Sequence, residues 1–268
     1  MKNKILAIII GITLLSVSGC GMFSKKYTKA KTDEYRLNTA GKKKVKLDNV
    51  NGTVTITHSN DSGALLVKAV REIKVKKKYL DTPFDEIEIK IDTTGSNISI
   101  ATEIEKKGED GLFKFNIARG QRVDYEIQIP SGLDIEVENV HGNIVASSLD
   151  NDLKIDLVNG KVSLENYSGL LECEITNGEF TGHIDSTRGI NINTVNGSVS
   201  LFLNNYINAN LRAESSNGKI VDDNLNFRDV IKEKGLFKGK LGNGGNANVD
   251  IKVETVNGRI KLYGRNEI

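Results

Sequence analysis

The chain has no tryptophan and contains only two prolines and two cysteines in 268 residues. Cys20 and Cys173 lie in regions of very different composition, so neither a disulfide framework nor a four-ligand zinc site is available. The 37 basic and 35 acidic residues nearly cancel to a net charge of +2. This balance gives no electrostatic basis for nucleic-acid binding or for an acidic substrate. A chain of this length can bury a substantial core without disulfides or metals.

The chain is rich in glycine and in β-branched and aliphatic residues. It contains 26 glycines, and its apolar residues are mostly isoleucine, valine and leucine, whereas aromatic residues make up only 6%. Isoleucine and valine favour strands, and glycine favours turns. The composition therefore predicts an all-β protein.

The first residues have the pattern of an export signal. Two lysines within Met1 to Lys4 precede an apolar run from Ile5 to Leu15, and small residues follow. This is the order of a secretory signal peptide. The tetrad Val17-Ser18-Gly19-Cys20 resembles the lipobox of bacterial lipoproteins. The resemblance implies cleavage between Gly19 and Cys20 and attachment of acyl chains such as palmitate to the Cys20 thiol.

A transmembrane anchor is the alternative, because no charged residue lies between Ile5 and Ser24 and a spanning helix needs about 20 apolar residues. The glycines and serines in this stretch favour the lipobox. We therefore assign residues 1–19 to a signal peptide and 20–40 to a lipidated N-terminus and linker. Both alternatives place the rest of the chain outside the cytoplasm, on the outer or surface leaflet of a membrane if the lipobox is correct.

A dipeptide of Asn or His followed by Gly recurs along the chain. From Gly142, its glycines follow one another at intervals of 18, 18, 19, 21 and 40 residues. Such a period indicates a stack of repeats. The dipeptides are Asn51-Gly52, His141-Gly142, Asn159-Gly160, Asn177-Gly178, Asn196-Gly197, Asn217-Gly218 and Asn257-Gly258.

Apolar and polar residues alternate on both sides of each dipeptide, as in Leu153, Ile155 and Leu157 before Asn159. Period-2 alternation predicts strands with one buried face. We expect positive φ angles at the dipeptides, which Gly adopts freely and Asn tolerates. The pattern predicts a β-solenoid or β-roll of about 20-residue rungs, and an antiparallel β-sandwich or meander is the alternative.

Residues 41–130 repeat less regularly than residues 131–264. We also expect a short helix within Asp222–Asn248, which would cover the end of the stack.

Two blocks resemble the putative adhesin family of bacterial β-strand repeat proteins. The first runs from Val123 through Pro130 and Gly132 to His141-Gly142, and the second runs from Leu241 to Leu262. The resemblance covers roughly residues 40 to 264 and implies a surface protein or lipoprotein with one β-strand repeat domain, which we assign to residues 41–264. The family offers no catalytic residues to transfer. His141 replaces the usual small or Asn residue, so an unbroken asparagine ladder is not expected.

No group of residues has the pattern of a catalytic or metal site. Cys173 alternates with Leu171 and Ile175, which predicts a buried thiol. Asp150, Asp152 and Asp156 come closest to a calcium site, but they lack the Gly-Asp nonapeptides of calcium-binding rolls. We therefore predict no catalytic residue, no metal, no cofactor and no small-molecule substrate.

The sequence thus predicts a non-enzymatic cell-envelope lipoprotein that presents a β-repeat interaction platform for adhesion or envelope sensing. The partners expected are the membrane, through the lipid anchor, and an envelope protein or a glycan. A structural, self-associating envelope component is the alternative, and a polysaccharide-acting enzyme is a third and weaker hypothesis.

Overall fold

The computed structural model describes residues 6–15, 26–76, 87–104, 120–242 and 248–265. Twenty strands form within them, and none of the described segments is a helix long and apolar enough to cross a membrane. The strands are β1 (Leu6–Leu15), β2 (Lys26–Asn38), β3 (Lys44–Asn51), β4 (Val54–His58), β5 (Ala64–Lys76), β6 (Ile87–Asp92), β7 (Asn97–Ile104), β8 (Arg122–Ile129), β9 (Asp134–His141), β10 (Ile144–Ser147), β11 (Leu153–Tyr167), β12 (Leu170–Ile184), β13 (Gly189–Asn196), β14 (Val199–Asn204), β15 (Ala209–Asn217), β16 (Ile220–Asp223), β17 (Phe227–Glu233), β18 (Leu236–Leu241), β19 (Asp250–Asn257) and β20 (Ile260–Arg265).

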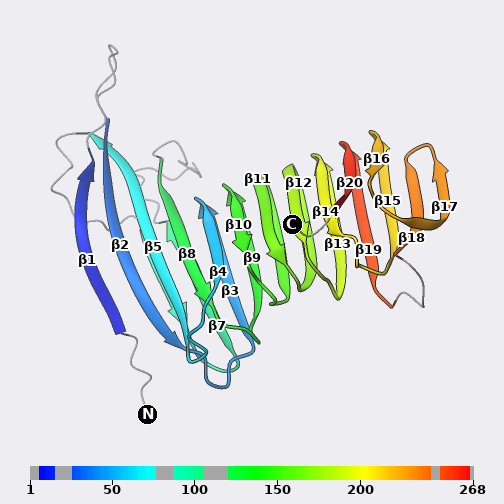
Figure 1. The fold of residues 1–268 in the computed structure, drawn as a ribbon. Coiled ribbons are helices and arrows are strands. Elements are labelled where there is room, and N and C mark those ends of the chain that lie inside the picture. Colours follow the sequence, from blue (N-terminus) through cyan, green and yellow to red (C-terminus); the bar gives the residue numbers. More distant parts are fainter. Residues whose placement is uncertain (1–5, 16–25, 77–86, 105–119, 243–247, 266–268) are drawn as a thin grey trace.

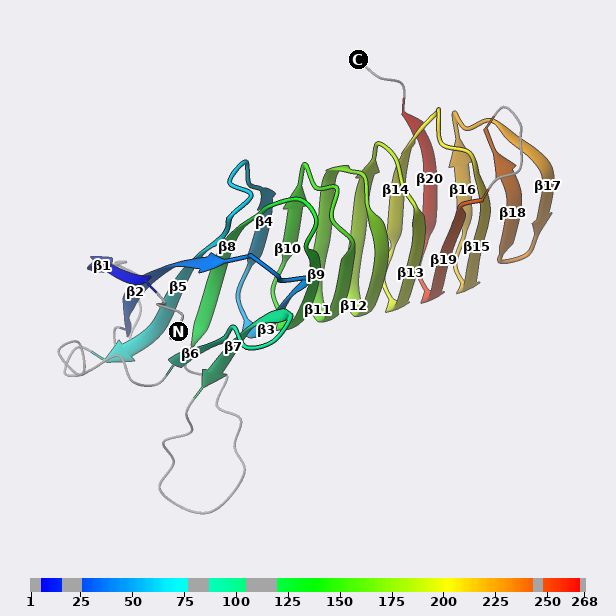
Figure 2. The ribbon, with the colours of Figure 1, turned by 90° about the horizontal axis from the view of Figure 1, so that it is seen from below.

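The strands form two walls that meet at the Asn-Gly and His-Gly dipeptides, which we call the corners. Strands that precede a corner make wall 1, in the order β3, β9, β11, β12, β13, β19, β15. Strands that follow a corner make wall 2, in the order β4, β10, β11, β12, β14, β20, β16. Within each wall these strands are parallel and in register, so the β-solenoid prediction is confirmed (Figures 1 and 2).

The rungs are not stacked in chain order. The last rung, β19 and β20, lies between the rung of β13 and β14 and the rung of β15 and β16. At the other end β3 pairs with β9, and Asn51 lies opposite His141 across 90 residues of sequence. The 40-residue interval between the last two corners contains β17 and β18, which belong to neither wall's set of rungs.

Alternation of apolar residues explains how the walls hold together. In β3, β9 and β11 every second side chain is buried, and the inward side chains of both walls form one core from Leu37 to Leu262. Strands paired on both sides and covered on one face bury an apolar stripe that no single rung could bury alone. Cys173 lies in this stripe and is 1% exposed, and burial raises the pKa of its thiol. The predicted buried cysteine is confirmed.

The N-terminal part is a twisted, mainly antiparallel sheet joined to the solenoid. On wall 2, β8 pairs parallel with β4 and antiparallel with β5, and β5 pairs antiparallel with β2 along its whole length. Figure 1 shows these as the long curved strands at one end of the molecule. Residues 26–38, which we predicted to belong to a linker, are strand β2 and thus part of the folded domain.

Strand β1, within the predicted signal peptide, pairs antiparallel with β2 at the edge of the sheet. Gly19 and Cys20 lie outside the described residues, so cleavage and lipidation at this position stay predictions.

The helix predicted within Asp222–Asn248 is wrong. The segment instead forms the hairpin β17–β18, and β18 pairs antiparallel with β15 at the end of wall 1. Phe237 and Leu241 are 2% exposed and alternate with exposed residues, so the period of the segment is that of a strand. The hairpin covers the last rung of wall 1 in the place where we expected the helix.

The corners differ in part from the tight turns that we expected. Gly52, Gly142 and Gly160 have the expected positive φ, but no corner asparagine does, and the described non-glycine residues with positive φ lie elsewhere. Glycine is required because neighbouring rungs approach closely at the backbone. A Cβ on Gly178 would lie 1.8 Å from the carbonyl oxygen of Gly160, although the φ of Gly178 lies outside the range that only glycine favours. The expected reason for the glycines is therefore wrong at this corner, and steric contact replaces it.

Candidate functional site: a groove along wall 1

The predicted corner residues do come together, as a ladder along the stack. Each asparagine after the first donates a hydrogen bond from its side-chain amide to the Oδ1 of the asparagine one rung earlier in the stack, at 2.9–3.1 Å. In stack order the ladder is Asn159, Asn177, Asn196, Asn257 and Asn217. The ladder ends at His141, whose Nε2 lies 3.4 Å from the Nδ2 of Asn159. Asn51 lies apart, since its amide donates to the carbonyl oxygen of Gln121. The ladder satisfies its own polar groups and is structural.

Immediately beside this ladder, wall 1 carries two rows of outward side chains that run from rung to rung. The first, which we call the acidic row, lies four residues before each corner glycine. The second, the valine row, lies two residues before it. In stack order the acidic row is Asp48, Glu138, Asp156, Glu174, Asn193, Glu254 and Glu214, and the valine row is Val50, Val140, Val158, Thr176, Val195, Val256 and Ser216.

Between the two rows lies a groove of about 780 Å³ that crosses all seven rungs. Strands within a sheet are about 4.8 Å apart, so the groove is roughly 29 Å long. The valine row is exposed along it: Val140, Val158, Val195 and Val256 are 37–46% exposed. These four exposed valines, interrupted only by Thr176, lie in line on an otherwise polar wall, which is a feature of interaction surfaces.

The inward side chains beneath the groove form its floor, and most of the polar ones bond to the corner backbone. Asn139 donates to the carbonyl oxygen of Gly52 at 3.0 Å, Thr255 to that of Gly197 at 3.0 Å, and Ser215 to that of Gly258 at 2.9 Å. Within the described chain, the Oδ1 of Asn139 and the Oγ1 of Thr194 are buried without a hydrogen-bond partner. Both residues line the groove.

The acidic row is only partly neutralised by the row of side chains on its far side from the groove. Lys46 lies 2.6 Å from Glu138, Lys154 lies 3.5 Å from Asp156, and Lys252 lies 3.0 Å from Glu254. Burial raises the pKa of Asp48, and Lys46 opposes this rise. Among the described residues Glu174 forms no ion pair. Asp48 and Glu214 are also paired, with Lys46 at 3.5 Å and with Arg212. The six carboxylates of the row face only four cations, so the net charge on this side of the groove is negative.

Three carboxylates at one end of wall 1 could hold a cation, since oxygens of Glu136, Glu138 and Asp156 lie within 4.8 Å of one another. The ammonium groups of lysines already occupy the space around them. Lys44 lies 3.3 Å from Glu136, and Lys154 lies 3.7 Å from it. This arrangement is a surface ion-pair network, and it does not change the prediction that the protein needs no metal.

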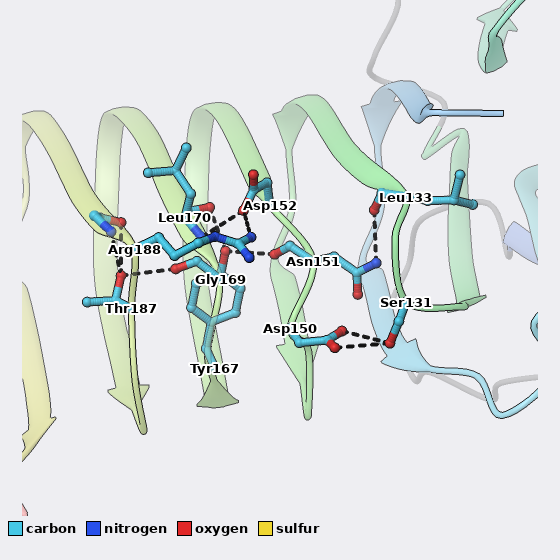
Figure 3. Close-up of polar contacts among 11 residues, drawn as sticks. Ser131, Leu133, Asp150, Asn151, Asp152, Tyr167, Gly169, Leu170, Thr187 and Arg188 are labelled. Carbon is cyan, nitrogen blue, oxygen red and sulfur yellow. Dashed lines mark hydrogen bonds and ion pairs between the residues drawn. The ribbon is translucent and has the colours of Figure 1, made fainter. Parts of the chain in front are cut away.

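The aspartates that came closest to a calcium site do not converge. Asp150 accepts hydrogen bonds from Ser131 at 3.0 Å, and Asp152 accepts one from the backbone of Leu170 at 2.9 Å and pairs with Arg188 (Figure 3). Both lie on the turns that return the chain from wall 2 to wall 1. Asp156 lies on wall 1 in the acidic row.

These return turns are tied together by further polar contacts. The Oη of Tyr167 lies 3.0 Å from the carbonyl oxygen of Asn151 and 2.6 Å from that of Leu170. Asn151, which is 3% exposed, donates to the carbonyl oxygens of Pro130 and Leu133. Figure 3 shows the bond to Leu133 and the bond from Thr187 to the carbonyl oxygen of Gly169. The return-turn edge is thus occupied by contacts between rungs and offers no open site.

Wall 2 carries a stack of three rings. The rings of His183 and Phe202 lie 4.4 Å apart between centroids, and those of Phe202 and Tyr263 lie 5.0 Å apart, nearly parallel in both cases. His183 also lies 3.7 Å from Glu165. The ring of Phe202 is covered on both faces by its two neighbours. The stack therefore stabilises wall 2 and leaves wall 1 as the better candidate surface.

Sequence reasoning missed the groove, although its signal was present. Aligning the repeats on the corner and reading four residues backward gives Asp-x-Val-Asn-Gly in two rungs and Glu-x-Val in two others, at Glu138 and Glu254. We used the corner dipeptides to find the repeats and did not compare the outward positions between them. Only the parallel register shows that these positions form continuous rows.

Comparison with known proteins agrees with the fold. The model of the family described as Toastrack DUF4097 matches residues 26–263. A putative cell adhesion protein from Clostridium sporogenes ATCC 15579 is 14% identical, with 88% of this chain and 100% of that chain covered and a TM-score of 0.45. A putative adhesin from Bacteroides fragilis NCTC 9343 is 13% identical, with 88% and 97% covered and a TM-score of 0.27.

A third solved structure, a putative lipid binding protein from Parabacteroides distasonis ATCC 8503, is 11% identical, with 87% and 96% covered and a TM-score of 0.30. No curated protein matches the chain.

Proposed function

The chain belongs to the Toastrack DUF4097 family, and we propose that it is a cell-envelope lipoprotein that holds a non-enzymatic docking surface, the wall 1 groove, outside the cytoplasm. The observation that carries this proposal is the groove itself, which crosses seven rungs with an acidic row on one side and four exposed valines on the other. A rigid surface of this length binds by contact along many rungs and needs no reacting group.

The lipid anchor supports the same role. Acyl chains on Cys20 would hold the domain at the membrane, because each buried CH₂ contributes about 0.8 kcal/mol and two or more chains give stable anchoring. The similar solved structures are named as a putative cell adhesion protein, a putative adhesin and a putative lipid binding protein, and these names are compatible with a role at a surface.

Anchoring is tested by mass spectrometry of the mature N-terminus and by fractionation of cells that carry Cys20→Ser. We expect the wild-type chain to begin at an acylated Cys20 and the variant to leave the membrane fraction. Recovery of a chain that still begins at Met1 would contradict the lipoprotein assignment.

Docking is tested by a photoreactive maleimide on single cysteines in intact cells. Cys173 is buried and Cys20 would be acylated, so a new exposed cysteine is the only free thiol expected to react. We compare Val158→Cys in the groove with Ser163→Cys on wall 2, both on strand β11. The proposal expects a crosslinked product of defined mass from the groove position alone, and equal yields from both positions would overturn it.

A further inference from the structure

The two sides of the groove differ in chemistry, so a ligand that binds between them needs different groups on its two sides. The acidic row contributes six carboxylates over seven rungs. The neighbouring outward row, two residues earlier in each strand, contributes four cations and two carboxylates: Lys46, Lys154, Lys252, Arg212, Glu136 and Glu172. The two rows together therefore carry four more negative than positive charges, which attracts a cationic ligand.

The opposite side is apolar, so a purely charged ligand would leave it uncovered. Val140, Val158, Val195 and Val256 are each 37–46% exposed, and they lie at the same position of their rungs. Covering exposed apolar area stabilises a complex by roughly 25 cal/mol for each Å² removed from water. A ligand that fits both sides needs cations along one edge and apolar groups along the other.

Other occupants fit less well. Anionic lipid headgroups and acidic glycans would meet the carboxylates of the acidic row. A second copy that applied the same surface would bring two acidic rows together, and like charges in an interface oppose association. A basic polypeptide in extended conformation places alternate side chains on opposite sides, as the groove requires, and about nine residues at roughly 3.3 Å each match its length.

We propose that the groove binds an extended basic segment of an envelope protein, with Lys or Arg side chains along the acidic row and apolar side chains along the valine row. This proposal rests on the proposed function and adds the chemistry of the partner. The side chains of one segment would then satisfy both rows at once, because its alternation separates them.

The probe is a fluorescent ten-residue peptide of alternating Lys and Val, titrated with the full-length protein in detergent and followed by anisotropy. A Glu-Val peptide and a Lys-Ser peptide of the same length are the controls for charge and for apolar contact. We expect the Lys-Val peptide to bind at least about tenfold more tightly than either control, and binding to weaken as salt screens the acidic row.

Matched variants locate the site. Asp156→Asn/Glu174→Gln removes two negative charges from wall 1 of β11 and β12, and Glu165→Gln/Glu179→Gln removes two from wall 2 of the same strands. We expect the first pair to weaken binding about tenfold and the second to change it less than about twofold. Equal effects of both pairs, or equal binding of the Lys-Ser peptide, would overturn the proposal.

The result can be separated from that of the crosslinking experiment. A partner crosslinked through Val158→Cys together with no peptide binding would refute the basic segment and leave the docking function intact. Peptide binding at the groove without any crosslinked partner in cells would support the groove chemistry and refute its use in the envelope.

Discussion

The N-terminal sheet and the solenoid use the same alternation of apolar residues but stabilise their strands in different ways. In the N-terminal part, β2 and β5 are 13-residue antiparallel strands, and the ion pair between Asp33 and Arg71 lies between them, with a distance of 2.5 Å and side chains 8% and 11% exposed. In the solenoid, each rung repeats its neighbour, and the side-chain polar groups at the corners bond to equivalent groups one rung away. In the solenoid, equivalent residues of neighbouring rungs therefore pair with one another, whereas the irregular N-terminal sheet depends on particular ion pairs.

The largest expected effect breaks the N-terminal part. Arg71→Met removes the closer of the two cations that pair with the buried carboxylate of Asp33, leaving only Lys31 at 3.7 Å, and it removes the hydrogen bond from Arg71 to the carbonyl oxygen of Ile87. Removing one partner of a buried pair costs about 4 kcal/mol of unfolding free energy, measured by urea denaturation. The control is Lys68→Met on the same strand, where the pair with Glu126 is exposed and the loss is below about 1 kcal/mol. Equal losses of unfolding free energy in the two variants would show that burial of the Asp33–Arg71 pair does not increase its contribution to stability.

The next effect breaks the solenoid at a corner. Gly178→Ala places a Cβ 1.8 Å from the carbonyl oxygen of Gly160, so the rungs must separate, at about 3 kcal/mol. Gly95→Ala is the contrast, because Gly95 has a φ of +63° but open space around it, and its cost is about 1 kcal/mol of backbone strain. Thermal denaturation of both variants measures the difference. A larger loss for Gly95→Ala would mean that backbone conformation governs the corners after all.

A smaller change tests the ladder. Asn177→Ala removes a donor to Asn159 and an acceptor for Asn196 on an exposed edge, and we expect a loss of about 1 kcal/mol. His141→Asn should extend the ladder by one rung and raise the unfolding free energy slightly, by less than about 1 kcal/mol, because the Nδ1 of His141 is buried without a partner within the described part of the chain. A destabilised His141→Asn would show that the imidazole packs better than an amide.

The smallest effect distinguishes the two walls by pH. Burial raises the pKa of Asp48 above its ordinary 3.8, whereas the hydrogen bond from Lys161 lowers the pKa of Glu179 below 4.5. The folded state thus favours protonated Asp48, and this contribution to stability is lost as pH rises through its raised pKa. The contribution of Glu179 has the opposite sign and is lost as pH falls through its lowered pKa. NMR titration of the carboxyl carbons measures both, and a pKa of Asp48 below 3.8 or a pKa of Glu179 above 4.5 would contradict the assignment.

The repeats could be predicted from the sequence because apolar and polar residues alternate within each strand. Leu153, Ile155 and Leu157 alternate before Asn159, and the same alternation recurs in the other rungs, so strands, rungs and the buried position of Cys173 could all be predicted. The candidate site was missed because the groove is formed by side chains of neighbouring rungs, which are far apart in the sequence. Val140 and Val158 look like scattered surface residues until parallel register places them side by side.

The linker and the end of the stack were misjudged for a related reason. Residues 26–38 are polar and rich in lysine, and they form β2 because β5 pairs with them along their full length. Within Asp222–Asn248, local composition did not separate a strand from a helix, and pairing of β18 with the open edge of β15 decided it. In both cases tertiary pairing overrode a weak local preference.

By itself, the sequence determined the all-β class, the period of the rungs and which side chains face the core, since these follow from alternation and from the corner dipeptides. Only the tertiary structure decided the order of the rungs, with β19 and β20 inserted before β15 and β16. Rungs with the same pattern can pair with one another in any order, and the choice depends on which edges remain open once the other strands have paired. The same pairing aligned the acidic and valine rows into one groove.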